Sequence, residues 1–137
     1  MNNELLRAKE RLSEGYTCVM VKGHKERCFT ERGVAPLISL LPSAEGAVFA
    51  DKVVGKAAAY LYVLLSARAV FAQTVSRGAR AVLERYGVPL ELETEVPAII
   101  NRRGDDLCPL EKALSGEYTP VDALGIINET LKNLKEG

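Results

Sequence analysis

The segment 50–56, with the sequence ADKVVGK, holds the residues best suited to chemistry. It joins the apolar run 47–49 to the apolar run 57–65, a pattern that predicts a buried strand breaking directly into a helix. Asp51 and Lys52 would then lie at the carboxyl end of the strand and on the first helical turn, where open α/β sheets bind ligands. Asp51 is a candidate acceptor or base, and Lys52 is a candidate electrostatic partner for an anion.

Lys56 extends this candidate site. It follows Lys52 by four residues, so on a helix both amines would lie on the same face, and Gly55 would leave room for close approach. Lys56 is therefore a candidate ligand-binding residue. The alternative is structural: Asp51 caps the helix and the two lysines are solvated.

Cys108 offers a different chemistry. It precedes Pro109, which is typical of a first helical position, and backbone N–H groups at a helix start lower the pKa of a thiol. Cys108 is therefore a candidate nucleophile. Glu111, a candidate ligand-binding residue, either orients the sulfur or folds back in a capping box. In the alternative, Cys108 is a small buried or capping residue, since no histidine lies nearby in the sequence to act as its base.

The remaining polar candidates lie in predicted loops and turns. Arg102 and Arg103 precede a Gly-Asp-Asp stretch, and their guanidinium groups could clamp a phosphate or a carboxylate, although such loops are more often only solvated. His24 is interpreted as a turn residue. Cys18 and Cys28 fall in predicted strands and are interpreted as core residues.

Composition limits the classes of function. A length of 137 residues with 47% hydrophobic content indicates one domain, residues 1–137, with a real core. Eighteen basic and eighteen acidic residues cancel, so neither an extended nucleic-acid surface nor a membrane surface is expected. Three cysteines in no disulfide framework, a charged N-terminal segment and no apolar run of bilayer length favour a cytoplasmic location.

Helical and strand patterns alternate along the chain and predict an α/β domain. The expected order is a helix to about residue 12, strands 17–22 and 27–30 as a hairpin, helix 34–41, strand 46–50, helix 52–66, strand 68–74, helix 76–86, strand 90–93, helix 108–114, and a last helix starting at Pro120. Uninterrupted apolar strands joined by helices imply parallel crossovers and a sheet covered on both faces. The expected fold is a three-layer αβα sandwich with a mixed sheet.

This order, with the stretches ADKVVGKAAA, VFAQTVS and INRRGDDLCPLEKAL, resembles a small uncharacterised bacterial family, the domain-of-unknown-function family numbered 1893. The resemblance extends from Thr17 over nearly the whole chain. It implies a cytidine deaminase-like fold. Because proteins of that fold commonly pair through helices, it also implies a homo-oligomer.

Deaminase chemistry itself is not expected. It needs a zinc-bound water held by an H-x-E or C-x-E motif at one strand-to-helix junction and by P-C-x-x-C at the next. The two expected junctions, residues 50–52 and 73–77, read ADK and QTVSR and contain neither motif. We therefore expect no metal site and no cofactor.

Two hypotheses for function remain. The first is a metal-independent enzyme or enzyme-like protein that binds a small anionic or nucleotide-like ligand, such as a phosphate-bearing molecule, at the carboxyl ends of the strands. Asp51, Lys52 and Cys108 would be its catalytic residues. The reaction type stays open: if Cys108 is the working group, thiol-based transfer is favoured over hydrolysis by activated water. The second is a non-catalytic ligand-sensing or oligomeric interaction domain.

Overall fold

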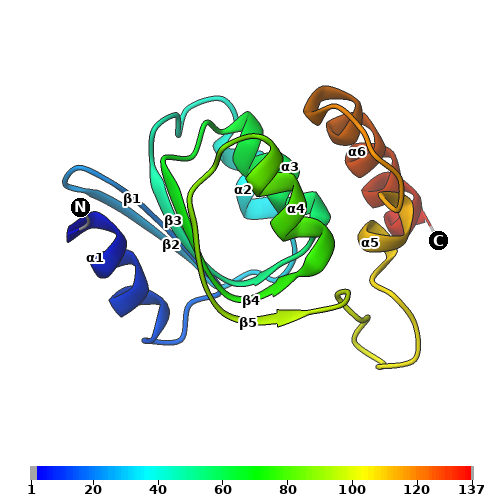
Figure 1. The fold of residues 1–137 in the computed structure, drawn as a ribbon, viewed down its shortest axis with the longest axis horizontal. Coiled ribbons are helices and arrows are strands. Elements are labelled where there is room, and N and C mark those ends of the chain that lie inside the picture. The colour runs from blue at the N-terminus through cyan, green and yellow to red at the C-terminus, as the bar shows by residue number, and fades with distance from the viewer. Residues whose placement is uncertain (1–2, 137) are drawn as a thin grey trace.

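A five-stranded mixed sheet organises the protein, whose computed structural model describes residues 3–136 (Figure 1). The strand order is β2-β1-β3-β4-β5. Strands β1 (Cys18–Lys22) and β2 (Lys25–Phe29) form the expected antiparallel hairpin, and β1 also runs antiparallel to β3 (Val48–Val54). Strands β4 (Ala69–Ser76) and β5 (Leu90–Val96) continue the sheet parallel to β3. The α/β class and the mixed sheet are thereby confirmed.

Helices lie on both faces of the sheet (Figure 1). Helix α1 (Asn3–Leu12) packs on one face against β1, β3 and β4. Helices α2 (Ala35–Leu40), α3 (Lys56–Leu64) and α4 (Arg77–Arg85) lie on the other. The alternation of side chains along each strand divides the core into a small apolar cluster under α1 and a large one under α3.

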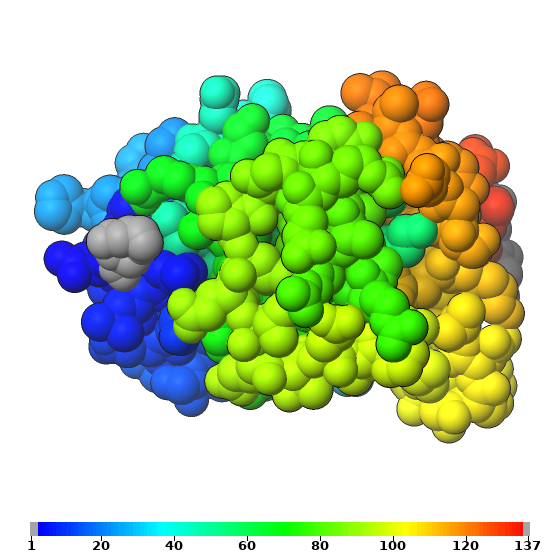
Figure 2. Space-filling model, viewed as in Figure 1, coloured from blue at the N-terminus to red at the C-terminus, as the bar shows by residue number. Residues whose placement is uncertain are grey.

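A further layer of helices lies outside α3, beyond the three layers expected from the sequence. Helix α6 (Pro120–Glu136) packs against α3 and α5 (Pro109–Ala113), and appears in orange and red at one end of the molecule in Figure 2. The reason lies in α3, whose residues 57–62 are all buried. A helix that is apolar all round must be covered on its outer side as well, and α6 covers it with the buried side chains of Ala123 and Ile127.

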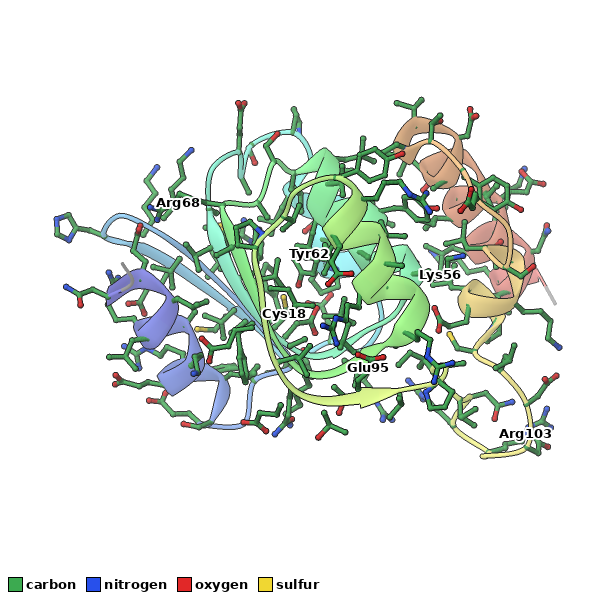
Figure 3. All side chains as sticks on the ribbon, in the orientation of Figure 1. Cys18, Lys56, Tyr62, Arg68, Glu95 and Arg103 are labelled. Atoms are coloured by element: carbon green, nitrogen blue, oxygen red, sulfur yellow. The ribbon has the colours of Figure 1, made fainter. Side chains whose placement is uncertain are left out.

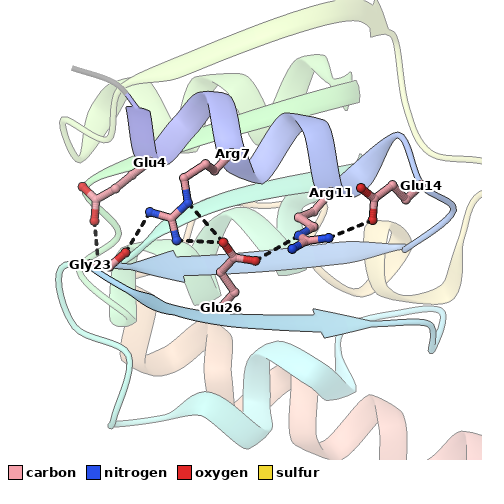
Figure 4. Close-up of polar contacts among 6 residues, drawn as sticks. All are labelled: Glu4, Arg7, Arg11, Glu14, Gly23 and Glu26. Carbon is pink, nitrogen blue, oxygen red and sulfur yellow. Dashed lines mark hydrogen bonds and ion pairs between the residues drawn. The ribbon is translucent and has the colours of Figure 1, made fainter.

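An ionic network fixes α1 to the β1–β2 hairpin (Figure 4). Glu26 on β2 accepts hydrogen bonds from Arg7 and Arg11 of α1. Arg7 also donates to the carbonyl oxygen of Gly23 in the hairpin turn, and the N–H of Gly23 donates to Glu4. Charged residues thus hold the helix over a hairpin whose outer strand is the edge of the sheet.

The structure corrects two expectations about single residues. Cys28 is exposed, because β2 is an edge strand and this residue lies outside both apolar clusters, whereas Cys18 on β1 is buried as expected. Asp51 does not begin a helix. Strand β3 continues past it to Val54, pairing with β4, and α3 begins only at Lys56 with Gly55 as its N-cap.

Candidate functional site

Asp51 points into the core beneath α3 rather than out of the sheet edge. Its Oδ2 atom accepts a hydrogen bond of 2.6 Å from the hydroxyl of Tyr62, and its Oδ1 atom accepts one of 3.3 Å from the N–H of Val53. The Sγ atom of Cys18, the β1 residue paired with Asp51, lies 3.6 Å from the same hydroxyl. Figure 3 shows Cys18 and Tyr62 inside the molecule, between the sheet and the helices.

Burial dominates the electrostatics of this cluster. Desolvation raises the pKa of Asp51 to about 7, although the hydrogen bonds from Tyr62 and from the backbone of Val53 and Lys52 lower it in part. Burial also raises the pKa of Cys18 and of Tyr62 well above the usual values. Asp51 therefore lies in the core and does not cap the helix, which was the structural alternative for this residue.

The side chain of Lys52 does not lie near the Asp51 carboxyl. Adjacent residues of a strand point to opposite faces of the sheet, so the half-buried Lys52 lies on the other side. Its backbone N–H donates to the carbonyl oxygen of Thr17. The expectation that Lys52 and Lys56 share one helical face is wrong, because Lys52 is in β3 and Lys56 is the first residue of α3.

Glu111 lies at the start of α3, although it belongs to α5. Its Oε1 atom accepts a hydrogen bond of 2.6 Å from the N–H of Lys56, and its Oε2 atom accepts one of 3.0 Å from the N–H of Ile99. The residue is only 7% exposed. Gly55 offers no capping side chain, so Glu111 supplies a distant cap that complements the positive end of the helix dipole. The sequence predicted that Glu111 either forms a capping box within α5 or orients the sulfur of Cys108. These hydrogen bonds show neither arrangement.

Lys56 lies beside this carboxylate. Its Nζ atom donates a hydrogen bond of 2.8 Å to the carbonyl oxygen of Gly116, in the link between α5 and α6. The aliphatic part of the Lys56 side chain packs against Gly78 of α4, where an added Cβ would lie 2.8 Å from Cδ of Lys56. Desolvation lowers the pKa of Lys56, and the charge of Glu111 raises it in part. Lys56 and Glu111 are therefore the predicted site residues that the fold brings together.

The other predicted site residues are dispersed. Cys108 is the half-buried N-cap residue of α5 and makes no side-chain cap, while its backbone N–H donates to the carbonyl oxygen of Ile99. Arg102 and Arg103 are exposed in the loop before α5. Figure 3 places Arg103 at the outer end of that loop, far from Lys56, and its nearest carboxylate is that of Asp105 at 3.9 Å.

Surface hollows lie away from the start of α3. One is a shallow depression between α4 and β5, lined by residues 80, 84, 87–90 and 92, and another runs along the outer side of α6 around Gly125. Within residues 3–136, no group of three or more His, Cys, Asp and Glu side chains is placed to hold a metal ion. None of the described helices has the length and apolar character needed to cross a membrane.

Three residues that contact the predicted site residues were missed by sequence reasoning. Tyr62 contacts Asp51, Ile99 contacts Glu111 and Gly116 contacts Lys56. Tyr62 lies in an apolar helix that gives no sign of a polar partner, and the other two contribute only backbone atoms. No local pattern could have identified them.

Comparison with known proteins agrees with this description of the fold. Residues 7–131 match the family TM1506, described as "Domain of unknown function (DUF1893)". The structure is similar to that of a DUF1893 family protein (TM1506) from Thermotoga maritima, with a TM-score of 0.84 and 22% sequence identity over 94% of this chain and 91% of that one. No curated protein matches the sequence.

Proposed function

The chain belongs to the DUF1893 family, and we propose that it is a non-catalytic binding protein for a small anion, which it takes at the start of α3. The observation that carries the proposal is the position of Glu111. A carboxylate from α5 is buried against the first N–H of α3, near enough to the Lys56 amine for its charge to raise the pKa of that amine.

Glu111 indicates what this position recognises. Two backbone N–H groups, from Lys56 and Ile99, each meet one oxygen of the same carboxylate. Helix starts bind anions through such N–H groups, and hydrogen bonds to a charged acceptor are stronger than neutral ones. The carboxylate or phosphate of a small ligand has the same pair of oxygens, so it would compete with Glu111 for these donors and for the charge of Lys56.

We further propose that the fold is cytidine deaminase-like and that binding has taken the place of catalysis. The two strand-to-helix junctions are residues 54–56 and 75–77, which read VGK and VSR and contain no histidine or cysteine. At the second junction the Ser76 hydroxyl caps α4 by accepting from the N–H of Ala79. Among residues 3–136, neither histidine nor carboxylate is hydrogen-bonded to the Cys108 thiol, so binding is better supported than thiol-based transfer.

The test is a thermal-shift titration with inorganic phosphate, acetate and nucleoside monophosphates at constant ionic strength. The wild-type protein is compared with Glu111→Ala, which vacates the position, and with Glu10→Ala as a control at an exposed position of α1, on the other face of the sheet. A ligand that binds the native state raises the melting temperature in a saturable way.

We expect Glu111→Ala to melt at a lower temperature and to be restabilised by phosphate at lower concentrations than the wild type. Adding Lys56→Met to Glu111→Ala should abolish that response, because the charge next to the N–H groups is removed. If phosphate and the other anions stabilise Glu111→Ala no more than the control, the start of α3 is not an anion site. The interaction-domain hypothesis then takes its place.

A further inference from the structure

Three elements of the fold meet at one polar cluster inside an otherwise apolar core. The Asp51 cluster consists of Asp51 from β3, Cys18 from β1 and Tyr62 from α3, with the Tyr62 hydroxyl between the carboxyl and the thiol. Tyr62 is fully buried, and its ring lies against that of Phe49 with 4.9 Å between centroids. The cluster therefore joins α3 to the two strands beneath it.

Within the described part of the chain, the Asp51 carboxyl faces no compensating positive charge. From α3 it faces Tyr62, from β1 it faces Cys18, and from β4 its paired residue is Ala72. Among residues 3–136, no lysine, arginine or histidine forms an ion pair or a hydrogen bond with this carboxyl. Its donors are the Tyr62 hydroxyl and backbone N–H groups. A protonated carboxyl fits such a place, whereas an ionised one is left buried without a counter-charge.

We propose that the Asp51 cluster couples the packing of α3 on β1 and β3 to pH, so that the helix packs tightly while the carboxyl is protonated and loosens when it ionises. This inference is independent of anion binding at the start of α3.

The direction of the coupling follows from the two states of the carboxyl. Burial raises the pKa of Asp51 from an ordinary 3.8 to about 7, so opening the cluster to water releases a proton between these values. The equilibrium constant for opening therefore increases as the pH rises from about 4 to about 7, and it is constant above about pH 7. Cys18 and Tyr62 stay neutral in this range because burial raises the pKa of both.

The protein contains its own reporter for this opening. Cys18 is buried in the cluster, whereas Cys28 is exposed on β2. Both thiols are titrated with dithiodipyridine, which reacts at acidic pH, and the labelling rate of each is read by peptide mass spectrometry. The ratio of the Cys18 rate to the Cys28 rate cancels the common pH dependence of the thiol reaction and reports local opening.

In the wild type we expect this ratio to rise by up to roughly tenfold per pH unit between about pH 5 and 7 and then to level off. In Asp51→Asn, which keeps the shape and loses the titration, the ratio should stay constant. Tyr62→Phe removes a hydrogen bond that lowers the pKa of Asp51, so the rise should continue to a higher pH before it levels off. The same rise in the wild type and in Asp51→Asn would overturn the proposal, as would an unchanged profile in Tyr62→Phe.

Discussion

The carboxylate of Glu111 caps α3 from 55 residues away, through a hydrogen bond of 2.6 Å from the N–H of Lys56. Most helix caps come from the residue just before the helix, but here that residue is Gly55, which has no side chain to offer. The same carboxylate binds the N–H of Ile99 in the chain that follows β5. One buried side chain thus connects α3, α5 and the segment between the sheet and the last two helices.

Replacing Glu111 should destabilise the protein far more than replacing an exposed glutamate. In Glu111→Gln the amide keeps the size of the side chain but turns an NH₂ group towards one of the two backbone N–H donors. We expect a loss of about 1–3 kcal/mol in the free energy of unfolding, measured by urea denaturation. Glu117→Gln, whose side chain is 82% exposed in its pair with Arg85, should change it by less than about 1 kcal/mol. Equal effects in the two variants would show that Glu111 is not a cap.

Two glycine-to-alanine substitutions should have opposite effects on stability. A Cβ at Gly55 would lie 3.1 Å from Oε1 of Glu111 and 3.2 Å from Cγ1 of Ile99, so Gly55→Ala should push the cap away and destabilise the protein. A Cβ at Gly125 in α6 would meet nothing within 4 Å. Gly125→Ala should therefore stabilise by about 0.5–1 kcal/mol, because alanine loses less backbone entropy in a helix. Thermal melts of the two variants check both signs.

The global stability should depend on Asp51 in a definite pH window. Because the folded state holds the proton more tightly than the unfolded state, ionisation of Asp51 costs stability as the pH rises from about 4 to about 7. Relative to Asp51→Asn, the wild type should lose on the order of 4 kcal/mol across this window. Urea denaturation of both proteins at a series of pH values measures the difference. Parallel profiles would mean that the carboxyl is solvated in the folded protein.

The network of Figure 4 should stabilise the hairpin in a salt-dependent manner. Arg7 and Arg11 hold the pKa of Glu26 below its usual range by donating hydrogen bonds to it. In Glu26→Gln, hydrogen exchange of the β1 and β2 amides should become faster, and the difference from the wild type should shrink at high salt. Glu10→Gln, at an exposed position of the same helix, is the control and should leave the exchange unchanged. A salt-independent effect would point to packing instead of charge.

Most of the fold could be predicted because its signals are local. The strand composition around residues 18–22, the turn at Gly23 and the apolar runs near 48 and 70 all correspond to observed elements. The end of β3 could not be predicted. Asp51 and Lys52 have the composition of a helix start, and only the pairing with β1 and β4 and the partner Tyr62 keep them in a strand. A polar residue that is buried by a distant partner looks, in sequence, like one that faces water.

The candidate site was predicted only in part, for a similar reason. Lys56 and Glu111 were both identified, but the sequence associated Lys56 with Lys52 and Glu111 with Cys108, their neighbours along the chain. The structure instead brings Lys56 and Glu111 to each other across 55 positions. The sequence was therefore enough to identify the two residues as candidates, whereas their contact with each other could be seen only in the fold.

The order of elements has a consequence for how the chain assembles during synthesis. All five strands precede residue 97, and the later residues add α5 and α6, which pack on helices and on each other. The complete sheet can thus pair before the C-terminal segment leaves the ribosome. Until that segment arrives, the outer side of α3 stays open to water and its first turn lacks the Glu111 cap. Helices α5 and α6 thus close a nascent fold that already has its topology.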